Sequence, residues 1–182
     1  MHKLIEKTFE TESTPKIDDK PLKSFHKNKI IGEDISFTDN GYYISPSFET
    51  LESFTLMELR KVENLVIGHK DFGKIEFLKP VDLSLIPLPS ICGKLITFEK
   101  RCCTVSFIGE KPEKDQGLNV PAMITLVGCY PKDKSTGEPI KDPNHPILKK
   151  HIGNLKSMND AQFESYDPET GSWSFTVEEP VV

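Results

Sequence analysis

The sequence predicts an α+β domain whose sheet is largely antiparallel. Segments with strand-like composition outnumber helical ones, and most of the connections between them are short. Two stretches show the three- to four-residue apolar spacing of amphipathic helices: residues 48–62 and the residues that follow Pro146. Strands joined by short loops pair as antiparallel neighbours, because parallel pairing needs a long crossover connection.

The elements are predicted in chain order from local signals. Ser47 is the expected N-cap of the first helix, which carries Phe48, Leu51 and Phe54 on one face, and Leu56, Leu59 and Val62 continue that face. The strands expected after it cover 64–68, 73–79, 94–99, 102–108 and 120–127. The last helix begins after Pro146, and its apolar stripe contains Ile147, Leu148, His151, Ile152 and Leu155. We expect His151 to be a hydrogen-bonded core histidine.

Residues 163–177 read as a closing hairpin of two short strands. Trp173, Phe175 and Val177 alternate along the second strand. The residues between the strands, 167–171 (DPETG), have turn chemistry, because proline presets φ for the first turn position and Gly171 supplies a positive φ.

Length and composition set the outer limits. The chain has 182 residues and 36% hydrophobic residues, enough for one core, and its net charge of −5 argues against nonspecific binding to nucleic acid or anionic membrane. We expect residues 1–38 to be a polar linker or tail and 39–182 to form the domain. No apolar run approaches the ~20 residues that a membrane span needs, so no membrane insertion is expected. The four cysteines lack a C-x-x-C pair and are interpreted as buried free thiols of an intracellular protein.

The segment from Gly68 to Phe77 offers two alternative functions. Residues 68–74 (GHKDFGK) match the start of a phosphate-binding loop, but Ile75 lacks the hydroxyl that ligates Mg²⁺ and a strand pattern follows. Residues 70–77 have the aromatic and basic character of an RNA-stacking strand, although Asp71 and Glu76 oppose phosphate binding. We interpret the first as a turn between strands and keep weak RNA binding as an alternative.

Seven segments, in the same order, are similar to one family. They are 41–47 (GYYISPS), 66–77 (VIGHKDFGKIEF), 80–83 (PVDL), 116–119 (QGLN), 130–135 (YPKDKS), 140–144 (IKDPN) and 166–173 (YDPETGSW). Together they make the chain resemble the C-terminal autopeptidase domain of the GLFG-repeat nucleoporins, and most of all its yeast-type branch from the cytoplasmic pore face. The resemblance implies an antiparallel β-sandwich-like fold flanked by helices, located at the nuclear pore complex in the nuclear envelope.

The resemblance also implies that this chain does not cleave itself. In self-cleaving members the final strand runs into His-Phe-Ser, and the histidine activates the serine for an N-to-O acyl shift. The corresponding positions here are Glu179, Pro180 and Val181, which offer neither an imidazole nor a nucleophile. We therefore expect no enzyme activity, no catalytic residue, no cofactor and no metal site, with an autoproteolytic processing domain as the alternative.

The family's mode of binding implies a partner and a binding residue. In the family, a lysine in the turn that matches residues 133–135 enters a pocket on the β-propeller nucleoporin of the cytoplasmic filament complex. Lys134 is the corresponding residue here, with Tyr130, Pro131 and Asp133 shaping the turn. The resemblance thus implies a docking domain that supports mRNA export and protein import, with other scaffold nucleoporins as further partners.

The resemblance finally implies a peptide groove beside the last strand, bounded in part by Trp173 and Phe175. In self-cleaving relatives this groove holds the C-terminal peptide. In this chain, its occupant is either the chain's own residues 178–182 or another peptide.

Overall fold

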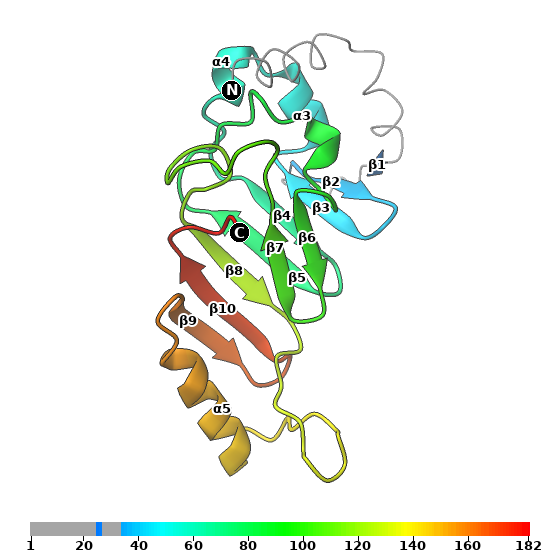
Figure 1. Cartoon of the computed structure of the whole chain (residues 1–182). Helices are drawn as coiled ribbons and strands as arrows, with labels where there is room; N and C mark the ends of the chain where they lie inside the picture. The colour runs from blue at the N-terminus through cyan, green and yellow to red at the C-terminus, as the bar shows by residue number, and fades with distance from the viewer. Residues whose placement is uncertain (1–24, 27–33) are drawn as a thin grey trace.

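The computed structural model describes residues 25–26 and 34–182, and its main feature is one eight-stranded antiparallel sheet (Figure 1). The strand order is β1 (Phe25–His26), β2 (Ser36–Thr38), β3 (Tyr42–Ser45), β4 (Val66–His69), β5 (Gly73–Phe77), β8 (Ala122–Leu126), β10 (Ser172–Val177) and β9 (Gln162–Asp167). All pairings between these strands are antiparallel. The prediction of an α+β domain with a largely antiparallel sheet is therefore confirmed.

In the part of the chain that the structure describes, a two-stranded ribbon and three α-helices accompany the sheet. The ribbon pairs β6 (Ile96–Glu99) with β7 (Cys102–Val105) and lies over β4 and β5 (Figure 1). Helices α3 (Phe48–Ser53) and α4 (Leu56–Leu59) lie at one end of the molecule, whereas α5 (Pro146–Lys156) packs beside β9 at the other. A short 3₁₀ helix, η1 (Leu88–Ser90), precedes the ribbon. The ribbon thus forms a second layer over part of the sheet.

A row of five buried side chains, one from each of five neighbouring strands, crosses the core face of the sheet. Each member pairs directly with the next, in the order Ile44, Ile67, Ile75, Ile124 and Phe175. None of the five is more than 9% exposed. Since side chains alternate between the two faces of a strand, a slip of one residue in any of these strands would turn its apolar set away from the core.

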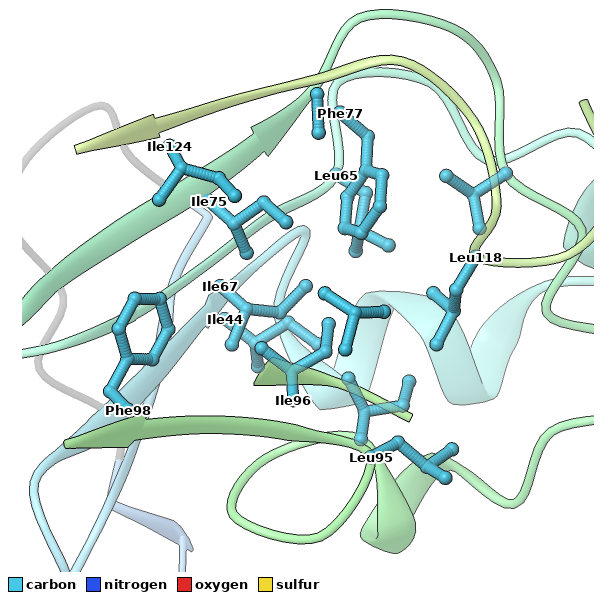
Figure 2. Packing of buried hydrophobic residues seen from close by; sticks show 14 of the residues in the cluster. Ile44, Leu65, Ile67, Ile75, Phe77, Leu95, Ile96, Phe98, Leu118 and Ile124 are labelled. Atoms are coloured by element: carbon cyan, nitrogen blue, oxygen red, sulfur yellow. The ribbon is translucent and has the colours of Figure 1, made fainter. Parts of the chain in front are cut away.

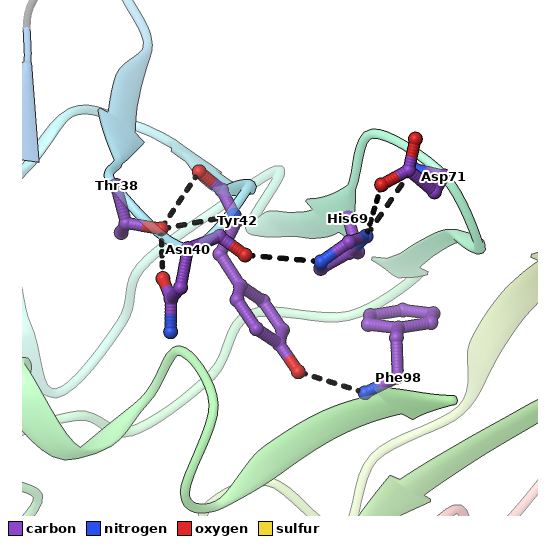
Figure 3. Close-up of polar contacts among 6 residues, drawn as sticks. All are labelled: Thr38, Asn40, Tyr42, His69, Asp71 and Phe98. Atoms are coloured by element: carbon purple, nitrogen blue, oxygen red, sulfur yellow. Dashed lines mark hydrogen bonds and ion pairs between the residues drawn. The ribbon is translucent and has the colours of Figure 1, made fainter.

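The ribbon closes the core over this row. Ile96 and Phe98 of β6 face the isoleucines of the sheet (Figure 2). The Phe98 amide also donates a hydrogen bond of 3.0 Å to the Tyr42 hydroxyl, which ties the ribbon to β3 (Figure 3). The His69 ring meets the Tyr42 ring edge-on at 4.9 Å. The ribbon is therefore held by both apolar packing and a buried polar contact.

The first helical segment differs from its prediction. Ser47 caps α3 as expected, because its side chain accepts a hydrogen bond from the Thr50 amide. The helix stops at Ser53, however, and Thr55 starts the separate helix α4 through a capping box with Glu58. Leu56 is 43% exposed and does not belong to the predicted apolar face. Leu59 packs against the core and Val62 is 1% exposed, as predicted.

Three further differences come from long-range packing. Strand β2 lies within the stretch predicted to be a tail, and its buried Ser36 accepts a hydrogen bond of 2.9 Å from the Phe48 amide. Most of that predicted tail, residues 1–24 and 27–33, lies outside the described residues. Ile147 is 43% exposed instead of part of the core stripe. Of the four cysteines, which are all free, Cys102 is exposed, so the expectation of buried thiols was wrong for it.

The Gly73→Ala substitution tests the close pairing of β5 with β8. A Cβ at Gly73 would lie 1.9 Å from the Thr125 carbonyl oxygen, and the φ of +140° is one that only glycine adopts readily. We expect the substitution to lower the free energy of unfolding by about 3 kcal/mol, measured by urea denaturation.

The matched control is Gly128→Ala. Gly128 also has a positive φ, +70°, but an added Cβ would meet nothing within 4 Å. Only the backbone strain of about 1 kcal/mol is therefore expected. Equal losses for the two variants would contradict the close strand approach.

Candidate functional site

The segment that follows β8 forms a self-contained loop at the end of the molecule opposite α4, the Lys134 loop (residues 131–140; Figure 1). Its ends are joined by a hydrogen bond of 2.9 Å from the Ile140 amide to the Pro131 carbonyl. Inside them, the Asp133 amide donates to the Glu138 carbonyl at 2.9 Å. The loop is therefore closed by its own backbone, as a small hairpin is.

Asp133 organises the tip of the loop through its side chain. One carboxylate oxygen accepts from the Ser135 amide at 2.7 Å, from the Ser135 hydroxyl and from the Thr136 amide at 3.3 Å. These hydrogen bonds favour the charged form and hold the pKa of the Asp133 carboxyl below its ordinary value. The Asp133 carbonyl accepts from the Gly137 amide at 2.8 Å, which completes the turn.

Lys134 lies at the tip of this turn with its side chain exposed. No residue between 34 and 182 forms a salt bridge with its ammonium group. The loop thus presents one cation on a backbone whose conformation is already set by the neighbouring aspartate.

Tyr130 fastens the base of the loop to the turn between β9 and β10. Its buried hydroxyl donates to the carbonyls of Pro168 at 2.8 Å and Glu169 at 2.6 Å. Its ring covers Gly171 so closely that an added Cβ would lie 2.7 Å from a ring carbon. Tyr130 therefore positions the loop from inside the protein, and its side chain is not available to a partner.

The Cys129 carbonyl, directly before Tyr130, is held by two side chains that the sequence did not single out as site residues. The Cys129 carbonyl accepts from His151 Nε2 of α5 at 2.8 Å and from the Tyr166 hydroxyl of β9 at 3.1 Å. Burial raises the pKa of Tyr166 to about 12, so its hydroxyl keeps the proton that it donates. His151 is hydrogen-bonded, as predicted, and joins α5 to the base of the loop.

A groove of about 770 Å³ lies beside β10, between the ribbon and the segment after α5. Trp173 and Phe175 belong to its floor, where their rings stack with centroids 4.1 Å apart. The floor also includes Ile124 and Leu126, while the walls are formed by Arg101, Cys102, Cys103 and residues 158–162. Both residues predicted to bound the groove therefore line it.

The chain's own C-terminal residues close one end of this groove. Val181 is buried, and the Val182 amide donates to the Val105 carbonyl at 3.1 Å, which extends the ribbon by one parallel bridge. Glu178 forms a salt bridge of 3.1 Å with Lys114. Residues 178–182 thus occupy the end of the groove and not its floor.

The three positions that the sequence analysis matched to a catalytic His-Phe-Ser contain no imidazole, hydroxyl or thiol in this chain. Glu179 lies 3.4 Å from the Asn119 amide nitrogen, Pro180 has no functional side chain, and Val181 is buried. Cys103 lines the groove, but burial raises the pKa of its thiol to about 12, which keeps it protonated at neutral pH.

The geometry of residues 68–77 argues against the two alternative functions. Residues 70–72 form the tight turn between β4 and β5, so no helix N-terminus is present to bind phosphate. The Phe72 ring is stacked on His69 with centroids 4.5 Å apart, and Phe77 is 4% exposed. Lys74 pairs with Glu76 at 3.0 Å. Phe72, Phe77 and Lys74 are thus engaged within the domain, which argues against an RNA-stacking strand.

In residues 25–26 and 34–182, no group of three or more His, Cys, Asp or Glu side chains is arranged to hold a metal ion. Within the same part of the chain, no helix has the length and apolar character required to span a bilayer.

Residues 39–179 match the family model described as Nucleoporin2, the Nup98-96 autopeptidase S59 family. The chain belongs to this family. It is 47% identical to nucleoporin NUP100/NSP100 of Saccharomyces cerevisiae over 93% of its length, and 52% identical to NUP116/NSP116 of the same yeast over 81%. It spans only 18% and 13% of those relatives, respectively. The family and these relatives indicate a component of the nuclear pore complex.

Solved structures give the same result for the fold. The C-terminal domain of NUP116 from Candida glabrata is 51% identical, with a TM-score of 0.73 over 79% of this chain and 92% of that one. A chain of the yeast heterotrimeric Nup82-Nup159-Nup116 nucleoporin complex is 50% identical, with a TM-score of 0.76 over 80% of this chain and 100% of its own length. The nucleoporin autopeptidase fold predicted from the sequence is therefore confirmed.

The hydrogen bonds of Asp133 predict an acid-dependent change confined to the loop. The folded-state pKa of the Asp133 carboxyl is lowered. The stability that this carboxylate gives the loop is therefore fully present above the ordinary pKa, and it is lost as pH falls through the lowered pKa. We expect the NMR shift of the Ser135 amide to titrate with a midpoint below 3.8, the ordinary value for aspartate.

The control is the Asp133→Asn variant. Its Ser135 amide shift should not titrate in this pH range, while the rest of its NMR spectrum should resemble that of the parent chain. A Ser135 amide that titrates at or above 3.8 would contradict the charged cap at the loop tip.

Proposed function

We propose that this domain is a non-enzymatic docking module that fastens a GLFG nucleoporin to the β-propeller nucleoporin of the cytoplasmic filament complex. The observation that carries the proposal is the exposed Lys134, presented without a salt-bridge partner among the described residues on a loop that Asp133 pre-forms. The similar chain in the yeast Nup82-Nup159-Nup116 complex supports a partner among nucleoporins of that kind.

The pre-formed loop gives Lys134 an energetic advantage as a binding residue. Ordering a flexible loop on binding costs about 0.5–1.5 kcal/mol for each side chain that is immobilised, and this loop is already closed by its own hydrogen bonds. A lysine ammonium that enters a concave, partly desolvated acidic pocket can contribute ~2 kcal/mol or more, whereas charges at an interface rim contribute little. Lys134, with Asp133 and Pro131 setting its position, is the proposed hot spot.

The proposed role of the whole protein follows from this attachment. A domain that holds a phenylalanine-glycine-rich chain at the cytoplasmic face of the pore would support mRNA export and protein import. Other scaffold nucleoporins are further proposed partners, with the groove of about 770 Å³ beside β10 as their proposed site. RNA binding is not part of the proposal.

The proposal of a domain without protease activity rests on the residues at the end of β10. Glu179, Pro180 and Val181 provide no nucleophile, and Val181 is buried against the ribbon. Acyl transfer needs a nucleophile and a base within hydrogen-bond reach of each other, and neither Pro180 nor Val181 offers a hydroxyl or thiol that the Glu179 carboxylate could activate.

Charge reversal of Lys134 tests the docking proposal. We expect Lys134→Glu to weaken binding to the cytoplasmic β-propeller nucleoporin at least tenfold in calorimetry, because one charge contact is replaced by repulsion. The melting temperature should not change, since the side chain is exposed.

Lys61→Glu is the matched control, because Lys61 is equally an exposed lysine but follows α4 at the opposite end of the molecule. It should keep its affinity within twofold. If the parent chain, Lys134→Glu and Lys61→Glu all bind with equal affinity, the interface does not include the Lys134 loop.

Intact mass tests the absence of self-cleavage. A chain extended beyond Val182 by a short peptide is expected to keep its full mass during prolonged incubation at neutral pH. A heat-denatured sample controls for ordinary hydrolysis. Release of the added peptide from the folded sample alone would show that the domain processes itself.

A further inference from the structure

A second surface lies at the opposite end of the molecule from the Lys134 loop. A cleft of about 460 Å³ opens between α4, the segment after β5 and the segment after β7, within the size range of ligand clefts. We name it the Leu85/Ile108 cleft after two lining residues, which are 43% and 47% exposed. Large apolar side chains in contact with water at a concave site mark a place for an apolar partner.

The cleft is continuous with the core of the domain. Its floor contains Leu95 and Leu118, which are 7% and 3% exposed and lie at one end of the packed core (Figure 2). Ile86 and Phe107 line it as well and are partly buried. An occupant would therefore extend the existing core instead of forming a separate layer.

The charges at the rim of the cleft are mainly acidic. The lining includes three carboxylates, from Asp82, Glu110 and Asp115, and one cation, Arg60. The Asp115 carboxylate is already paired with Lys79 at 2.8 Å. Asp82 accepts hydrogen bonds from Ser84 and forms no salt bridge with a residue that the structure describes. A matching ligand would combine apolar side chains with positive charge.

The chain carries such a segment in its own first residues. Leu4, Ile5 and Phe9 provide three apolar side chains within six positions. Lys3 and Lys7 outweigh Glu6, so residues 3–9 carry a formal charge of +1. Residues 10–24 connect this segment to β1 and span up to about 50 Å when extended, which is enough to reach across a domain of this size. We propose that residues 3–9 of this chain occupy the Leu85/Ile108 cleft.

Covalent attachment makes weak binding sufficient for this contact. A tethered segment has an effective concentration in the millimolar range, so it fills its site even when the free peptide binds only modestly. The contact would cover the exposed apolar residues of the cleft while the Lys134 loop at the other end stays free.

The test measures binding of a fluorescent peptide that copies residues 3–9. We expect the peptide to bind at least tenfold more tightly to the 182-residue variant Leu4→Asp/Ile5→Asp than to the parent chain, because the parent's own segment competes for the cleft. Adding Ile108→Glu to that double variant should abolish peptide binding. Adding Ile147→Glu, on α5, should not, although Ile147 is similarly exposed at 43%.

Each other result overturns the proposal. Equal peptide affinity for parent and double variant would show that the chain's own segment is not the occupant. Absence of binding to either would show that the peptide does not fit. The methyl NMR signals of Leu85 and Ile108 provide a further check. If they shift with protein concentration and are the same in the parent and the Leu4→Asp/Ile5→Asp variant, the occupant is a second copy of the chain.

Discussion

The aligned row of Ile44, Ile67, Ile75, Ile124 and Phe175 is the constraint on which the rest of the structure depends. It sets the register of five strands at once, because each member pairs directly with its neighbours and all are buried. The register of β8 and β10 in turn determines where the Lys134 loop leaves the sheet, where the turn between β9 and β10 lies, and where the C-terminal residues meet the ribbon.

The register of β8 and β10 determines the position of the Lys134 loop through a short series of contacts. Tyr130 leaves the end of β8 and inserts between the loop and the turn before β10, where its hydroxyl reaches two carbonyls and its ring covers Gly171. The Cys129 carbonyl next to it is held by His151 and Tyr166. A charge at the tip of a loop therefore has a defined place relative to the sheet, which is what a single-residue contact with a partner requires.

Local signals in the sequence predicted much of the fold and of the site. The N-cap at Ser47, the helix start at Pro146 and the turn before Gly171 all depend on neighbouring residues, and all are present. The contacts that could not be predicted join distant segments: Tyr130 with residues 168–171, Ser36 with Phe48, and Val182 with β7. Such contacts depend on topology, which periodicity and turn chemistry do not encode. The role of Lys134 came from family resemblance alone, because composition describes only an exposed turn.

The most direct test of the account is a double-mutant cycle between Gly171 and Lys134 in binding to the cytoplasmic β-propeller nucleoporin. Gly171→Ala would push the Tyr130 ring, which now lies 2.7 Å from the position of the added Cβ, without touching the lysine. The account predicts that Gly171→Ala weakens binding in the parent chain but adds no further loss once Lys134→Ala is present, because both act through one loop. Additive losses, or an unchanged affinity for folded Gly171→Ala, would contradict it.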